Sequence, residues 1–154
     1  MKLIPTAFFT ALCLSFVLFT ACNKNEDDDQ DLVVNNNIII NAAQEVPVNP
    51  STATGKMTAQ YNMETNILTY TVTFSGLTGN ASAAHIHGLG EPGFNAPVLQ
   101  TFAGFPAAPQ GAYSGSLFVD GVAIKEENIL NGRFYVNIHT AMYPGGEIRG
   151  QITF

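Results

Sequence analysis

Apolar and polar residues alternate one by one along much of this chain, and this period of two constrains its fold more than any other feature. Two such runs lie between residues 56 and 74, with apolar positions Met57, Ala59, Tyr61 and Met63 in the first and Leu68, Tyr70, Val72 and Phe74 in the second. Successive side chains of a strand point to opposite faces, so each run predicts a strand with one apolar face. The two runs predict a β-hairpin with a threonine-rich face in solvent and the apolar face packed on a second sheet.

Six more segments have the short length and the glycine or proline boundaries of strands. They are residues 38–43, 83–87, 97–102, 113–119, 133–140 and 147–154. The helical candidate is 124–130, which Asn131-Gly132 would end. The sequence therefore predicts an all-β fold, an antiparallel, Greek-key-like β-sandwich or flattened barrel with one short helix near 124–130.

Residues 1–21 have the pattern of a bacterial lipoprotein signal peptide. Lys2 precedes an apolar run from Ala7 to Phe19, and the small residue Ala21 directly precedes Cys22. The run is shorter than the roughly 20 residues that span a bilayer as a helix. We expect Cys22 to be lipidated and to anchor the protein in a membrane. Ordinary signal cleavage or an uncleaved anchor is the alternative.

Residues 22–37 are expected to form an acidic flexible tether, with a single domain over 38–154. The tether carries five acidic residues against Lys24, a net −4 of the formal −6 of the chain, and is too polar to fold by itself. An acidic run after a lipidated cysteine resembles the signal that exports some lipoproteins to the bacterial surface; a plain spacer is the alternative. These features predict the bacterial cell envelope, at the outer membrane. The weakly acidic domain gives no electrostatic basis for binding nucleic acid.

All three histidines of the chain lie in two predicted strands, His85 and His87 in one and His139 in another. Residues i and i+2 of a strand share a face, with Cα atoms about 6.5–7 Å apart, a spacing at which two imidazoles can bind one metal ion. A third imidazole would complete the usual minimum for an open transition-metal site. Because Ile86 and Ile138 take the core direction, the three histidines are expected together on the outer face.

Copper and zinc are the metals that this set would favour, because neutral imidazole binds both. A shared ion predicts ring nitrogens within about 3–4.5 Å of one another. The structural alternative is that the histidines hydrogen-bond covering loops, for which the segments 89–97 and 104–111 are candidates. Glu91, Glu147 and Tyr143 are the nearest candidates for a fourth contact.

Several motifs occur in the order found in the CHRD domain family, which this chain resembles over about residues 38–154. They are Ala43-Gln44-Glu45-Val46-Pro47, Ala84-His85-Ile86-His87-Gly88, Tyr135-Val136-Asn137-Ile138-His139-Thr140 and Gly146-Glu147-Ile148-Arg149-Gly150. The family is named after chordin, an extracellular protein, and its microbial members are mostly secreted or lipid-anchored. The resemblance marks Glu45, Glu147 and Arg149 as shared positions without giving their roles. An exposed ion pair between Glu147 and Arg149, at i and i+2, is one structural possibility.

The His-x-His strand is also similar to the copper-binding strand of Cu/Zn superoxide dismutases. This chain departs from that family because it has neither a fourth histidine nor the histidine-rich zinc loop.

Three functions remain from the sequence. The preferred one is a noncatalytic binding or structural module at the cell surface, tethered at Cys22, with an extracellular protein, a glycan or a metal as ligand. The second is a copper- or zinc-binding protein using His85, His87 and His139. The third is a dismutase-like redox enzyme. Because the sequence offers no complete catalytic constellation, we expect the protein not to be an enzyme.

Overall fold

The structure, a computed structural model, describes residues 31–154, so the predicted signal peptide and Cys22 lie outside the described residues. The described chain forms strands, one turn of 3-10 helix (Ala42–Gln44) and one short α-helix, α1 (Glu126–Leu130). The strands are β1 (Leu32–Asn41), β2 (Thr54–Asn62), β3 (Ile67–Ser75), β4 (Ala81–Gly88), β5 (Val98–Thr101), β6 (Gly111–Phe118), β7 (Phe134–Thr140) and β8 (Ile148–Ile152). None of the helices within the described residues has the length and apolar character needed to cross a membrane.

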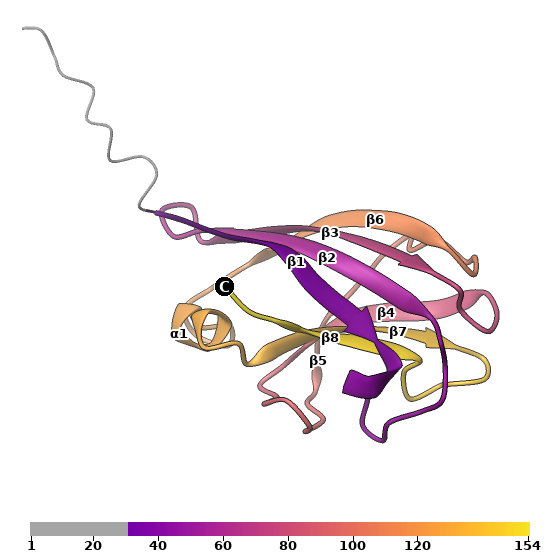
Figure 1. The fold of residues 1–154 in the computed structure, drawn as a ribbon. Coiled ribbons are helices and arrows are strands. Elements are labelled where there is room, and N and C mark those ends of the chain that lie inside the picture. The colour runs from indigo at the N-terminus through magenta and orange to yellow at the C-terminus, as the bar shows by residue number, and fades with distance from the viewer. Residues whose placement is uncertain (1–30) are drawn as a thin grey trace, which may run out of the picture.

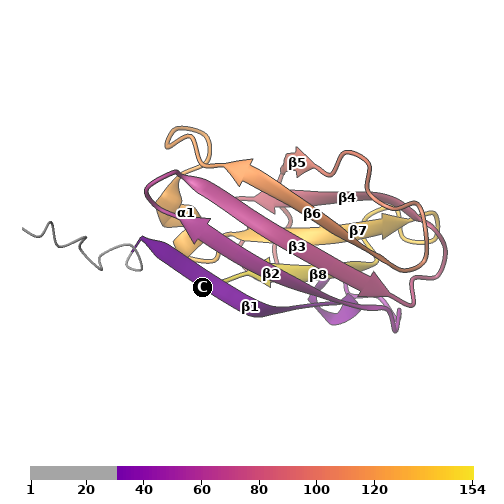
Figure 2. The same ribbon diagram turned by 90° about the horizontal axis from the view of Figure 1, so that it is seen from above.

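The strands form one antiparallel sheet with the order β5-β4-β7-β8-β1-β2-β3-β6. The sheet turns over between β8 and β1, whose register holds a single residue pair, Asn41 opposite Arg149. As a result β1, β2, β3 and β6 form one layer and β4, β7 and β8 the other (Figures 1 and 2). This architecture confirms the predicted all-β sandwich or flattened barrel with one short helix.

The apolar faces of the two layers enclose the core. In the β2–β3 hairpin the alternating residues Met57, Tyr61, Leu68 and Val72 are fully buried, while the threonines between them face outward, as predicted. Burying such side chains contributes about 1.5–3 kcal/mol each. From the other layer, Ile86 and Ile138 pack into the same core. The alternation therefore fixes which side of β4 and β7 is left for other roles.

Two expectations about the loops and the domain start need correction. The strand β1 begins at Leu32, so the end of the expected tether belongs to the sheet, where Leu32 pairs with Asn62. The segment 104–111 does not cover the outer face: its Phe105 ring stacks on Phe74, 4.9 Å between centroids, and packs against the core. An aromatic ring in that loop is drawn to the apolar interior at the open edge between β5 and β6.

The segment 89–97 does cover the outer face of the second layer, as predicted. It leaves β4 at Gly88 and returns into β5 at Val98, on the lower side of Figure 1. Its backbone carbonyls accept hydrogen bonds from His87 of β4, Tyr135 of β7, and Arg149 and Gln151 of β8. The outer face is for this reason largely buried, and β7 is buried at Tyr135 and Asn137 as well as on its core side.

Candidate metal centre on the outer face of β4 and β7

The register of β4 and β7 brings the three histidines together. The two strands pair antiparallel, with His85 opposite Asn137 and His139 opposite Ala83. All of these side chains project from the outer face, away from the core that Ile86 and Ile138 enter. The prediction that two strands distant in sequence lie side by side with their imidazoles on one outer face is confirmed.

The imidazole nitrogens lie close enough to form one cluster. His85 Nδ1 is 3.0 Å from His139 Nε2, and one ring nitrogen of each histidine lies within 4.8 Å of the others. This spread is slightly wider than the expected 3–4.5 Å. Within residues 31–154, the cluster is the one group of histidine, cysteine and acidic side chains spaced to hold a metal ion, and it includes neither Glu91 nor Glu147.

Backbone carbonyls fix the orientation of two of the rings. His87 Nδ1 donates to Ala96 O at 2.9 Å, and His139 Nδ1 donates to Pro144 O at 3.0 Å. A carbonyl oxygen only accepts hydrogen bonds, so in each neutral ring the proton sits on Nδ1 and Nε2 keeps its lone pair. These two Nε2 atoms both point at the side chain of Asn137, at 3.0 Å each from its Oδ1. Metal-binding histidines usually carry a carbonyl or carboxylate partner of this kind on the second nitrogen.

Burial disfavours the charged form of two of the three imidazoles, those of His85 and His139. It lowers the pKa of His85, and the neighbouring rings of His139 and His87 lower it further. Burial also lowers the pKa of His139, where the hydrogen bond to Pro144 opposes the shift and His87 adds to it. Neutral imidazoles are the form that binds metal ions, because protonation occupies the lone pair.

A stack of three planar groups supports His87 from one side. The ring of Tyr135 lies parallel to that of His87, with 4.7 Å between centroids and 3° between planes. The guanidinium of Arg149 lies over the ring of Tyr135, with its central carbon 3.4 Å from the ring centroid. Arg149 is 1% exposed and donates to Phe94 O at 3.0 Å and to Gln151 Oε1 at 3.1 Å. The stack thus ties the loop 89–97 to β7 and β8.

The possible ion pair between Glu147 and Arg149 is absent from the described structure, in which both side chains are buried and each has other partners. Glu147 precedes β8 and turns into a cage of donors: Oε1 accepts from Ser51 Oγ at 2.7 Å and Thr78 N at 2.9 Å, and Oε2 from the hydroxyls of Thr78 and Thr140. The cage joins the loop before β2, the turn before β4 and the end of β7. Sharing a strand face at i and i+2 was not enough to predict a pair, because the turn at Gly145-Gly146 redirects Glu147.

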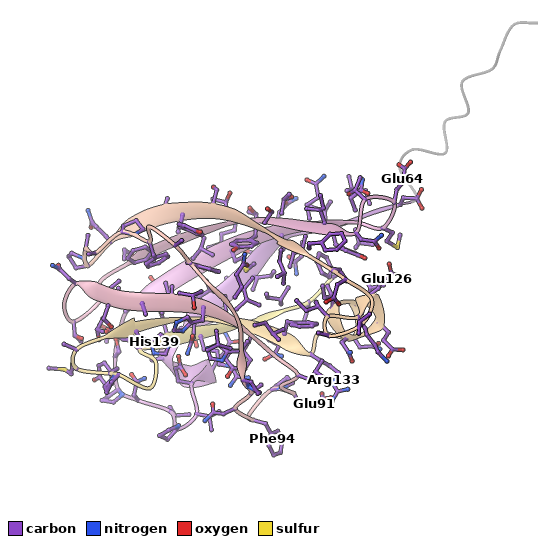
Figure 3. All side chains as sticks on the ribbon, turned by 180° about the vertical axis from the view of Figure 1, so that it is seen from behind. Glu64, Glu91, Phe94, Glu126, Arg133 and His139 are labelled. Atoms are coloured by element: carbon purple, nitrogen blue, oxygen red, sulfur yellow. The ribbon has the colours of Figure 1, made fainter. Side chains whose placement is uncertain are left out.

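The other expected fourth contacts have structural roles. Glu91 forms a surface ion pair with Arg133, 3.1 Å between Oε1 and Nε, which Figure 3 shows at the edge of the loop. Tyr143 lies in the turn after β7, where its carbonyl accepts from Gly146 N.

Glu45 lies under this surface with an unusual carboxyl group. Glu45 is 3% exposed, and its Oε1 atom has no hydrogen-bond partner. Burial raises the pKa of Glu45 to about 7, although a backbone hydrogen bond at Val46, the charge of Arg149 and the side chain of Asn137 lower it. An amide lowers a carboxyl pKa by donating an N–H, which fits Asn137 turning its nitrogen to Glu45 and its oxygen to the histidines.

Sequence reasoning identified the histidines but missed the residues that organise them. Asn137 and Tyr135 share the outer face of β7 with His139 by the same alternation, yet nothing in a single sequence marks them as contacts of the imidazoles. The available signal was the register: once β4 and β7 are paired, Asn137 lies opposite His85 and Tyr135 opposite His87.

One comparison with known proteins identifies a family for this chain. The family model described as CHRD domain matches residues 37–152, which is nearly the whole described chain. No curated protein and no solved structure matched. The chain belongs to the CHRD domain family.

Proposed function

We propose that this protein is a noncatalytic CHRD-domain module that binds copper or zinc through His85, His87 and His139. The observation that carries the proposal is the convergence of three imidazoles, one nitrogen of each within 4.8 Å of the others, on a face outside the core. The sequence alone favoured a binding module without deciding among a protein, a glycan and a metal as its ligand. The cluster favours a metal over a protein or a glycan as that ligand.

The distances suit a single ion after small ring rotations. Ligand atoms at about 2.0–2.1 Å from a tetrahedral ion lie about 3.3 Å apart. The 3.0 Å between His85 Nδ1 and His139 Nε2 is close to that edge length, and the separations to His87, within 4.8 Å, would have to close by at most about 1.5 Å. His87 and His139 are already oriented by carbonyls on Nδ1, so little side-chain entropy remains to be lost on binding.

The structural alternative explains the same residues less completely. Hydrogen bonds to Ala96 and Pro144 account for Nδ1 of His87 and His139. They leave Nε2 of His87 facing Oδ1 of Asn137, itself an acceptor, whereas His85 Nδ1 can donate to Nε2 of His139. Facing acceptors repel unless a proton or a cation lies between them.

Metal binding is tested on the full-length chain purified without a polyhistidine tag. Because the chain contains three histidines in all, the H85A/H87A/H139A variant has no imidazole left. We expect the wild type to bind one equivalent of Cu²⁺ or Zn²⁺ in calorimetry and the triple variant to bind none. The exposed substitution Gln60→Ala, on β2 in the other layer, serves as the matched control. A wild type that ignores both ions, or a triple variant that binds equally well, refutes the proposal.

The proposed location is the bacterial cell envelope, with a lipid on Cys22 anchoring the module to the outer membrane. This proposal rests on the sequence of residues 1–22. Mass spectrometry of the mature N-terminus should find an acylated cysteine, and Cys22→Ser should release the protein from the membrane fraction. Protease treatment of whole cells distinguishes display on the surface from the inner leaflet. An unmodified Cys22 in the mature protein contradicts the anchor.

The noncatalytic part of the proposal has its own test. We expect copper-loaded protein to consume superoxide no faster than an equal concentration of the triple variant with added copper. Faster consumption would support the dismutase-like alternative.

A further inference from the structure

The side chain of Asn137 occupies the centre of the histidine cluster. It projects from β7 opposite His85 and is 2% exposed. Its Oδ1 lies 3.0 Å from His87 Nε2 and 3.0 Å from His139 Nε2. His139 Nε2 lies in turn 3.0 Å from His85 Nδ1. Four potential ligand atoms, three ring nitrogens and one amide oxygen, are thus gathered in one place.

We infer that Asn137 Oδ1 is the fourth ligand of the site, which makes it an N3O centre selective for a divalent cation over Cu⁺. The inference rests on the proposed metal binding and deepens it. The three contacts of 3.0 Å are close to the edge of about 3.3 Å expected for a tetrahedral set. An ion at the centre is attracted to each of these atoms.

Asn137 turns the oxygen of its amide toward the cluster. Nδ1 of His87 and Nδ1 of His139 each donate to a backbone carbonyl, so Nε2 of each ring faces the amide oxygen with its lone pair. On its other side the amide lies beside the buried carboxyl of Glu45, which suits the amide nitrogen.

The type of donor determines the selectivity. An amide oxygen is a hard donor that suits divalent ions, whereas Cu⁺ prefers soft sulfur and low coordination numbers. Zn²⁺ and Cu²⁺ accept imidazole and oxygen together. Removing the oxygen should therefore weaken Zn²⁺ binding more than Cu⁺ binding.

A crystal structure of the zinc-loaded wild-type protein tests the inference without a substitution. We expect Asn137 Oδ1 at about 2.0–2.2 Å from the ion. A water molecule as the fourth ligand, with Asn137 away from the ion, overturns the inference and leaves the three-histidine proposal in place. A wild type that binds no metal overturns both.

Affinities of variants supply a second test. Asn137→Ala is expected to lower the Zn²⁺ affinity about 10-fold or more and the Cu⁺ affinity much less, so that the ratio of the two falls. Asn137→Asp, which keeps an oxygen, should retain Zn²⁺ binding, and Asn36→Ala on the exposed part of β1 is the matched control. Equal losses for both ions in Asn137→Ala indicate a positioning role and contradict ligation.

Discussion

Replacing Glu147 with glutamine should test how much the buried carboxylate cage contributes to the fold. Glu147 is fully buried, and its two oxygens accept four hydrogen bonds from Ser51, Thr78 and Thr140. Glutamine keeps the volume of the side chain but turns one acceptor oxygen into an NH₂ group. Two of the four donors then lose their acceptor.

The size of the loss follows from the bonds removed. Hydrogen bonds to a charged group contribute about 1.5–3 kcal/mol each, so losing two gives about 3–6 kcal/mol. Hydroxyl groups can rotate toward other acceptors, which places the expected loss near the lower end, at about 3 kcal/mol. A domain with about 5–15 kcal/mol of total stability would lose a large share of it. The melting temperature should fall by roughly 10 °C.

Urea denaturation at pH 7, with the chelator EDTA present, measures this loss. Glu64→Gln, at an exposed position in the β2–β3 turn, is the matched control and should change stability by less than about 0.5 kcal/mol. Thr140→Val removes one donor and leaves the carboxylate with the other three, so its loss should be smaller than that of Glu147→Gln. If Glu147→Gln is as stable as Glu64→Gln, the cage does not hold these segments together.

The pH dependence of the same comparison has a defined sign. Burial opposes ionisation of Glu147, but hydrogen bonds from Thr140, Ser51 and Thr78 outweigh it and lower its pKa. A lowered folded-state pKa means that the stabilisation is complete above the unfolded value, about 4.3, and is lost as the pH falls through the folded value. The gap between the wild type and Glu147→Gln should therefore close only in acid.

Further predictions concern the neighbouring residues. The pKa of Glu45 is raised from 4.5 to about 7, so its ionisation destabilises the fold as the pH rises through that range. The free energy of unfolding of Glu45→Gln, relative to that of the wild type, should therefore increase by up to about 3 kcal/mol between pH 4.5 and 8 in EDTA. A difference that stays constant over this range would refute the reasoning. Gly146→Ala should unfold at clearly lower urea concentration, because its φ of +133° is strained for alanine and the new Cβ would collide with the Glu45 carboxyl; combining it with Glu45→Ala should recover part of the loss if the collision matters. Zinc at about 100 times its Kd should stabilise the wild type by about 2.7 kcal/mol, measured as a shift of the urea midpoint, and should leave the H85A/H87A/H139A variant unchanged.

The alternation of apolar residues predicted the strands well because each strand has one face in the core. Leu68, Val72, Ile86 and Ile138 all point inward where their period of two places them. The same argument placed the histidines on the outer face. The alternation does not specify which residues of β4 and β7 lie opposite each other. The direct contacts of Asn137 with His87 and His139 could therefore not be predicted from the sequence.

The sequence predicted which residues lie on the outer face of β4, β7 and β8 better than it predicted whether a loop buries them. A period of two tells which side a residue faces, but it does not tell whether a loop buries that side. Arg149 would be an exposed cation on an open sheet, yet the segment 89–97 supplies carbonyls that bury it. Likewise, nothing local to Glu147 showed that Ser51 and Thr78, far apart in the sequence, would converge on its carboxylate.

The position of the histidine cluster outside the two-layer core separates the scaffold from its chemistry. Ile86 and Ile138 hold the layers together from one side of β4 and β7, while the imidazoles project from the reverse side. Substitutions at His85, His87 and His139 therefore change the outer face without touching the side chains that fill the interior. The stability of the sandwich and the chemistry of this face can be altered independently of each other.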